Sequence, residues 1–115
     1  MNWIKVMPQS ELPEGSWHKT EVGGRDIALV NHQGQIYAMS STCPHMGGPV
    51  YKGEITAAGT IICPWHHSEF DLRTGELKDW APRLGGVFKV VRSRRPLPVF
   101  PARVENGDIW VGLEE

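Results

Sequence analysis

The sequence predicts an all-β protein, an antiparallel β sandwich or partly open barrel, from three observations. Its 13 glycines and 9 prolines divide the 115 residues into short pieces. None of these pieces repeats apolar residues at helical spacing over three turns, so we expect little helix. Short runs rich in β-branched and aromatic residues alternate with turn signals, and such tight turns favour antiparallel pairing.

The strands are expected in eight runs, which cover residues 3–6, 17–22, 27–30, 36–39, 60–63, 69–72, 97–104 and 108–111. Turn residues separate neighbouring runs. Gly23-Gly24 and Gln33-Gly34 each lie between two runs, and Asn106-Gly107 is the dipeptide that a two-residue type I′ hairpin favours. The segment 78–96 differs, because its prolines, glycines and basic residues predict a long surface loop with one strand at 87–91.

Length and charge restrict what the chain can do. We expect one domain over residues 1–115, with room for one core. With 12 basic and 13 acidic residues, the net charge of -1 predicts neither nucleic acid nor an anionic membrane as partner. No stretch approaches the roughly 20 apolar residues of a membrane span, and the N-terminus lacks a secretory signal, so we expect a cytoplasmic protein. In that compartment the two cysteines are more often metal ligands or redox groups than a disulfide.

Two short segments carry the residues with metal chemistry. Residues 41–49 contain Cys43 and His45 in a C-x-H pattern, and residues 62–71 contain Cys63 and His66 in a C-x2-H pattern. Each segment therefore offers one thiolate and one imidazole, the ligand types of iron-sulfur and zinc sites. Two such loops can close over a single metal centre.

The residues beside these ligands fit a loop that lies close to a cluster. Gly47 and Gly48 allow close backbone approach and a positive φ, whereas Pro44 and Pro64 stiffen the chain and remove a donor. Pro49 closes the first loop. A structural zinc site is the alternative, although its paired ligands usually have two or more residues between them and it does not need a Gly-Gly-Pro turn.

The segments CPHMGGP and CPWHHSEFDLRTGE resemble the two cluster-binding loops of Rieske-type ferredoxins, and PLPVFPARVENGDIWV resembles the closing hairpin of that family. The resemblance runs from about residue 36 to the C-terminus, except for the basic loop. It implies a Rieske-type β sandwich with a cluster-binding subdomain of two loops, at about 41–50 and 62–71. It also implies one [2Fe-2S] cluster per chain, with Cys43 and Cys63 on one iron and His45 and His66 on the other.

The respiratory branch of the family carries an additional cysteine in each loop, and the two form a disulfide. The corresponding positions here are Gly48 and Trp65, so the chain resembles the soluble ferredoxins and the small subunits of assimilatory NAD(P)H nitrite reductases. Such a chain is expected near the low end of the Rieske potential range.

The resemblance also indicates which residues surround the cluster. Gly47, Gly48, Trp65 and Ser68 are expected next to the ligands, with the Ser68 hydroxyl donating to a bridging sulfur and Trp65 shielding the cluster. His67 stands where many members have glycine. It is expected at the surface, although its imidazole is an alternative ligand to that of His66. Trp3, Trp17 and Trp110 are expected to pack in the sheets or the core.

The function implied by the resemblance is one-electron transfer from a reductase to a terminal oxygenase or a related redox enzyme. The chain contains no catalytic triad or nucleotide-binding glycine motif, so we expect an electron-transfer protein and not an enzyme. A small subunit that serves the large subunit of a nitrite reductase is the first alternative, and a zinc-stabilised binding module without redox activity is the second. Met46, Pro49, Trp65 and the exposed edges of His45 and His66 are expected to form a weak docking face. The basic loop 83–95 is expected to be a solvated surface loop, and steering of an acidic partner is the alternative.

Overall fold

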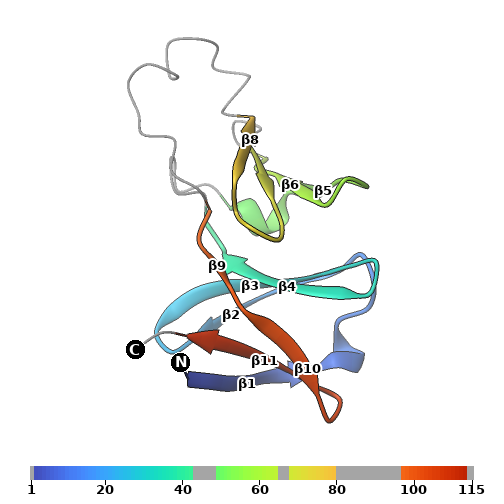
Figure 1. Ribbon diagram of the computed structural model, residues 1–115, viewed down its shortest axis with the longest axis vertical. Helices are drawn as coiled ribbons and strands as arrows, with labels where there is room; N and C mark the ends of the chain where they lie inside the picture. Colours follow the sequence, from blue (N-terminus) through green and yellow to red (C-terminus); the bar gives the residue numbers. More distant parts are fainter. Residues whose placement is uncertain (1, 43–48, 65–67, 80–96, 114–115) are drawn as a thin grey trace.

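Three antiparallel sheets stacked in layers make up the computed structural model, which describes residues 2–42, 49–64, 68–79 and 97–113 (Figure 1). The first sheet has the order β1-β11-β10, the second β2-β3-β4-β9 and the third β5-β6-β7-β8. The strands are β1 (Asn2–Pro8), β2 (Trp17–Val22), β3 (Arg25–His32), β4 (Gln35–Ser40), β5 (Glu54–Ile55), β6 (Thr60–Ile62), β7 (Glu69–Asp71), β8 (Leu77–Asp79), β9 (Val99–Phe100), β10 (Ala102–Glu105) and β11 (Asp108–Leu113). Two 3-10 turns, η1 (Gln9–Glu11) and η2 (Val50–Lys52), are the helical elements of the described residues, so the predicted all-β class is confirmed.

The β3–β4 and β10–β11 hairpins turn where the sequence predicts. Gln33 and Gly34 have φ angles of 55° and 85°, and Asn106 and Gly107 have φ angles of 54° and 80°. Two consecutive positive φ values are typical of the type I′ turn, whose twist matches that of the strands it joins. These turns set the register of the hairpins and therefore which side chains face the core.

Strand β3 lies in the middle layer and is buried on both faces. Ile27 and Leu29 pack in the core between the middle sheet and the β1-β11-β10 sheet. Ala28 and Val30 pack in a second core, between the middle sheet and the β5-β6-β7-β8 sheet. All four side chains have an exposed fraction of 0%. Burial on both faces explains why the strand is a continuous apolar run and shows no alternation with polar residues.

The single strand predicted at 97–104 is wrong, because the chain changes sheets at Pro101. Before this residue β9 pairs with β4 in the middle sheet, and after it β10 pairs with β11 in the first sheet. Proline has no N–H to donate to a ladder. The Pro101 carbonyl oxygen accepts a hydrogen bond of 2.9 Å from the backbone N–H of Gly112, which belongs to β11.

The short strands β5 and β8 were not predicted. Each has at most three residues, too few for a periodic pattern, and β8 includes the start of the segment expected to be a surface loop. The strand predicted at 87–91 and the rest of the basic loop lie outside the described residues. In the described part of the chain, no helix has the length and hydropathy that a membrane span requires.

Candidate functional site

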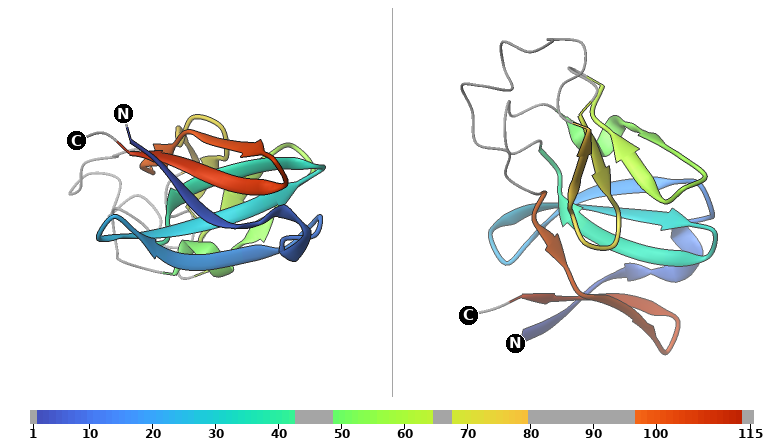
Figure 2. Two further views of the ribbon diagram at one scale, coloured as in Figure 1. Left: turned by 90° about the horizontal axis from the view of Figure 1, so that it is seen from below. Right: turned by 45° about the horizontal axis from the view of Figure 1, so that its top comes forward.

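The third sheet carries the candidate metal centre, and the right-hand view of Figure 2 shows it above the middle sheet. Of the predicted ligands the structure describes Cys63, and of the residues expected around them it describes Ser68. The other predicted site residues lie outside the described ranges: Cys43, His45, Met46, Gly47, Gly48, Trp65, His66 and His67. The described residues therefore show how both loops are anchored.

The second predicted loop leaves β6 and returns to β7 through buried residues at both ends. Cys63 directly follows β6 and has an exposed fraction of 1%, and Ser68, directly before β7, has one of 2%. The backbone N–H of Cys63 donates a 2.8 Å hydrogen bond to the carbonyl oxygen of Ser68. This bond holds the two ends of the loop together and fixes the direction in which the chain leaves the sheet.

The first predicted loop is closed in the same way. Ser41 is fully buried directly after β4, and its carbonyl oxygen accepts a 3.3 Å hydrogen bond from the backbone N–H of Tyr51 in η2. The hydroxyl of Ser41 has no hydrogen-bond partner among the described residues. Val50, the first residue of η2, is fully buried in the same apolar core as Cys63. The two loops therefore start from one common core.

Hydrogen bonds between side chains connect the strands that bear the second loop. The Thr60 hydroxyl on β6 donates to the Glu69 carboxylate on β7 over 2.6 Å. The hydroxyl oxygens of Thr56 and Thr60 lie 2.6 Å apart. Because the Thr60 hydrogen is directed to Glu69, Thr56 is the donor in this second bond. Hydrogen bonds to a carboxylate are stronger than those between neutral groups. The hydrogen-bonded series Thr56–Thr60–Glu69 therefore stiffens the sheet next to Cys63.

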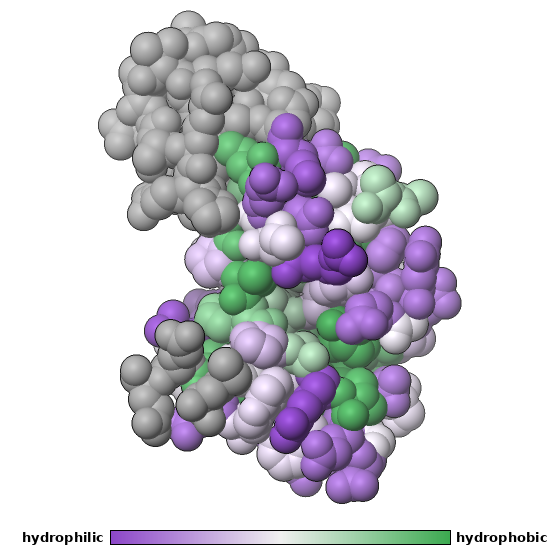
Figure 3. Space-filling model, viewed as in Figure 1, coloured by the Kyte–Doolittle hydropathy of each residue, from purple (hydrophilic) through white to green (hydrophobic). Residues whose placement is uncertain are grey.

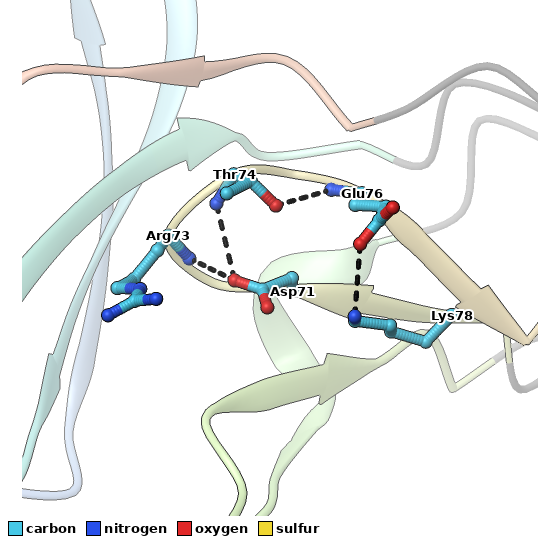
Figure 4. Close-up of polar contacts among 5 residues, drawn as sticks. All are labelled: Asp71, Arg73, Thr74, Glu76 and Lys78. Carbon is cyan, nitrogen blue, oxygen red and sulfur yellow. Dashed lines mark hydrogen bonds and ion pairs between the residues drawn. The ribbon is translucent and has the colours of Figure 1, made fainter.

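Polar contacts shape the turn between β7 and β8 in the third sheet (Figure 4). One carboxylate oxygen of Asp71 accepts hydrogen bonds from the backbone N–H groups of Arg73 and Thr74, at 2.8 and 3.3 Å. This is an Asx turn, in which a side chain replaces a backbone acceptor. The carbonyl oxygen of Gly75 then accepts a 2.8 Å bond from the N–H of Leu97, which lies just before β9. This bond ties the turn to the segment that leads into β9.

A groove of about 240 Å³ lies where this turn faces β4, β9 and β10. Apolar side chains gather at this level in the space-filling view, between the upper layer and the lower sheets (Figure 3). Leu72, Val99, Phe100 and Ala102 are among the residues that line the groove. None of its lining residues is a predicted ligand, so the groove belongs to the junction of the layers and not to the candidate metal centre.

The surroundings of Cys63 fit an iron-sulfur ligand. Its side chain packs among apolar residues such as Phe70 and Leu72, which exclude water from the sulfur. A hydrophobic shell of this kind tunes the potential of a metal centre and limits access of solvent to it. The described residues contain no group of three or more histidine, cysteine, aspartate or glutamate side chains that could hold a metal ion, because three of the four predicted ligands lie outside them.

The layered β fold and the buried Cys63 that follows β6 are consistent with the predicted iron-sulfur class, and comparison with known families tests it. The chain matches the Rieske [2Fe-2S] domain over residues 2–101, so it belongs to the Rieske [2Fe-2S] family. The predicted family is therefore confirmed.

Two curated relatives differ in how much of their length the chain covers. It is 30% identical to the ferredoxin subunit of 3-phenylpropionate/cinnamic acid dioxygenase of Escherichia coli K12, over 100% of this chain and 97% of that protein. It is 35% identical to human apoptosis-inducing factor 3 over 88% of this chain, and this match spans only 15% of the human protein. The relative of matching length is thus a dioxygenase ferredoxin subunit, whereas the chain spans only a small part of the human relative.

Two solved structures resemble the fold over almost its whole length. The ferredoxin of carbazole 1,9a-dioxygenase from Nocardioides aromaticivorans IC177 superposes with a TM-score of 0.80 and 23% identity, over 99% of this chain and 100% of the other. A ferredoxin in a complex of reduced oxygenase and oxidized ferredoxin of carbazole 1,9a-dioxygenase has a TM-score of 0.75 and 26% identity, over 97% of both chains. The predicted Rieske-type architecture is therefore confirmed.

Trp17 departs from the sequence-based expectation. It was expected to pack in a sheet or the core, but its exposed fraction is 43% and its ring contacts that of Tyr51. The signal was present in the sequence of β2, where the two residues that follow Trp17 are polar and the strand offers no second large apolar side chain on the same face. An edge strand of this composition exposes its aromatic residue.

Proposed function

We propose that this protein is a Rieske ferredoxin that carries single electrons to the terminal oxygenase of a dioxygenase system, and that it has no enzymatic activity of its own. In this proposal one [2Fe-2S] cluster per chain is held by Cys43, His45, Cys63 and His66. The buried position of Cys63 at the start of a closed loop supports it. The end-to-end match with a dioxygenase ferredoxin subunit supports the choice of partner, and favours a separate carrier over a nitrite reductase subunit or a zinc module.

The cluster, when bound, supplies reversible one-electron oxidation and reduction. The protein contributes ligands and their environment. Cys63 offers a thiolate from within the apolar core, and its hydrogen-bonded loop holds this sulfur in place before the cluster is inserted. Because Val50 and Cys63 pack in the same core, we propose that the two loops and the three sheets act as one domain over residues 1–115.

Spectroscopy of anaerobically purified protein tests the cofactor. We expect two irons and two acid-labile sulfides per chain, and visible absorption bands that a zinc-thiolate site lacks. After reduction with dithionite, electron paramagnetic resonance should give a lower average g value than that of a cluster with four cysteine ligands, because two histidines ligate one iron. A colourless protein that binds one zinc ion per chain would disprove the proposal.

Single substitutions test the ligands. Cys63→Ser and His66→Ala should lose the rhombic signal of the mixed-ligand cluster, whereas His67→Ala is the matched control and should retain it. The reverse result, with signal lost in His67→Ala and retained in His66→Ala, would transfer the ligand role to His67. Electron delivery is tested separately by oxidation of the reduced protein on mixing with the terminal oxygenase.

A further inference from the structure

An aromatic and basic surface patch lies beside the first predicted loop. Trp17 on β2 and Tyr51 in η2 form an edge-to-face pair, with ring centroids 5.1 Å apart and an interplanar angle of 71°. The Lys19 ammonium lies 5.3 Å from the Tyr51 ring centroid, and the Lys52 ammonium lies 5.7 Å from it. We call these four residues the Tyr51 patch.

The patch is on the same face of the middle sheet as the core below the predicted cluster. Trp17 is paired with Val30, and Lys19 with Ala28, and residues directly opposite each other in an antiparallel ladder face the same side. Val30 and Ala28 belong to the core that also buries Cys63. The third sheet, which is the proposed cluster-binding layer, covers this face over β3 and β4. Strand β2 is at one edge of the middle sheet, so the patch lies at the rim of the covered face.

The first predicted loop ends at the patch. Residues 41–50 return to the fold through η2, which lies against β2 (Figure 2). The hydrogen bond between the N–H of Tyr51 and the carbonyl oxygen of Ser41 joins the patch to the residue before the loop. A partner that binds the patch therefore lies next to the loop that is proposed to hold Cys43 and His45.

The exposure of Trp17 needs an explanation other than packing within the chain. Trp17 and Val104 are the large hydrophobic residues exposed in the described structure, at 43% and 40%. Val104 lies on β10 in the first sheet, whereas Trp17 lies beside the cluster-binding layer. Tryptophan and tyrosine are the residues that most often supply the binding energy at protein interfaces.

The charge of the patch indicates what kind of partner it fits. Both lysines are exposed, and neither forms an ion pair within the part of the chain that the structure describes. Their ammonium groups lie near one aromatic ring, so the patch combines positive charge with apolar area in a small space. Such a surface is complementary to carboxylates that surround an apolar contact.

We propose that the Tyr51 patch is the docking surface for an acidic surface of the terminal oxygenase. This inference rests on the proposed function, because that function supplies the oxygenase as the partner. The lysines accelerate encounter through long-range attraction, and the Trp17 ring provides the contact that slows dissociation. Docking at this rim brings the oxygenase against the first loop.

Stopped-flow oxidation of the reduced protein tests the proposal. The probe is a terminal oxygenase from the same organism, chosen because it oxidises the reduced wild-type protein. At low ionic strength the double variant Lys19→Gln/Lys52→Gln should lower the bimolecular rate constant about tenfold, and its rate should fall less steeply with added salt. Trp17→Ala should weaken binding of the oxygenase about tenfold, whereas Trp17→Phe, which keeps a ring, should restore most of the affinity.

Matched controls lie on the first sheet, away from the cluster-binding layer. Lys5→Gln removes one exposed positive charge from β1, and Val104→Ala truncates the other large exposed hydrophobic residue. Both should leave the rate constant and its dependence on salt unchanged. The visible spectrum, the midpoint potential and the Tm of every variant verify that the cluster and the fold are intact.

The outcomes separate this inference from the function on which it rests. If the wild-type protein passes electrons to the oxygenase and the patch variants do so at the wild-type rate and salt dependence, the docking assignment is wrong and the carrier function stands. It is equally wrong if the patch variants slow only the reduction of this protein by its reductase. If no oxygenase oxidises the reduced wild-type protein, the proposed function fails and the inference fails with it.

Discussion

Replacement of Gly53 by alanine tests how closely η2 packs against the strand that precedes Cys63. Gly53 has φ and ψ angles of -74° and 167°, an extended conformation that alanine adopts freely. A Cβ atom at this position would lie only 2.1 Å from the carbonyl oxygen of Ile62 and 2.9 Å from its carbonyl carbon. Both are backbone atoms of the chain in β6, so no change of side-chain rotamer can relieve the clash.

The size of the effect follows from these distances. Ordinary contact of a Cβ begins near 3.4 Å, so the 2.1 Å separation forces η2 and β6 apart by about 1.3 Å. Overpacking of this kind costs about 2 kcal/mol, and weakening the Glu54–Ile62 pairing costs about 1 kcal/mol more. The lower entropy of the unfolded alanine chain offsets up to about 1 kcal/mol. The net loss in the free energy of unfolding is about 2 kcal/mol, which lowers the Tm by about 8 °C in a domain of this size.

Thermal unfolding followed by circular dichroism measures the loss, and iron content measures its effect on the site. Because Cys63 follows Ile62 directly, the displaced strand should also lower the iron bound per chain. Gly59→Ala is the control. Gly59 has a φ of 85°, but a Cβ atom there would have no neighbouring atom within 4 Å, so this variant carries only the left-handed strain of about 1 kcal/mol. A Gly53→Ala protein as stable as Gly59→Ala, with full iron content, would refute the steric argument.

Three further substitutions have expected outcomes. Asn31→Ala removes a buried amide that donates a 2.8 Å hydrogen bond to the Leu12 carbonyl oxygen. Chemical denaturation should show that the free energy of unfolding falls by about 2 kcal/mol, and a fall below about 0.5 kcal/mol would contradict this role. Trp110→Phe removes a buried indole N–H that has no partner among the described residues, so the same measurement should change by less than about 1 kcal/mol in either direction. Glu76→Gln breaks an exposed ion pair of 3.0 Å with Lys78, and stability should stay unchanged because water screens the pair. Because the Glu76 carboxylate raises the pKa of Lys78, the pKa of that lysine, followed by nuclear magnetic resonance, should fall in this variant; an unchanged pKa would contradict the contact.

Local features of the sequence predicted the hairpins well. The Asn106-Gly107 turn was predictable because few residue pairs adopt two consecutive positive φ angles. The apolar run at 27–30 was recognisable as a strand because its residues are β-branched or aliphatic and turn signals lie on both sides. Its burial on both faces was not, since a run of this length carries no information about how many layers cover it.

Other features depended on contacts between distant parts of the chain. The break at Pro101 was missed although proline disfavours the interior of a strand, because apolar residues continue on both sides of it and only the positions of β4 and β11 divide them between two sheets. The polar residues that follow Trp17 on β2 were a signal of its exposure, but they were not sufficient. Its neighbours in sequence show that it lies in a strand, but whether the strand is at an edge depends on how the sheets are ordered.

The amino-acid sequence by itself determined the ligand inventory and the turns, because thiolates, imidazoles and positive φ angles are properties of single residues and short segments. The tertiary structure decided that the two predicted loops share one apolar core, in which Val50 and Cys63 pack together although they come from different loops. It also decided that Trp17 and Tyr51 meet at the rim of that core. These arrangements depend on the stacking of three sheets, which arises from burial of apolar area over the whole chain and not from the conformational preference of any one segment.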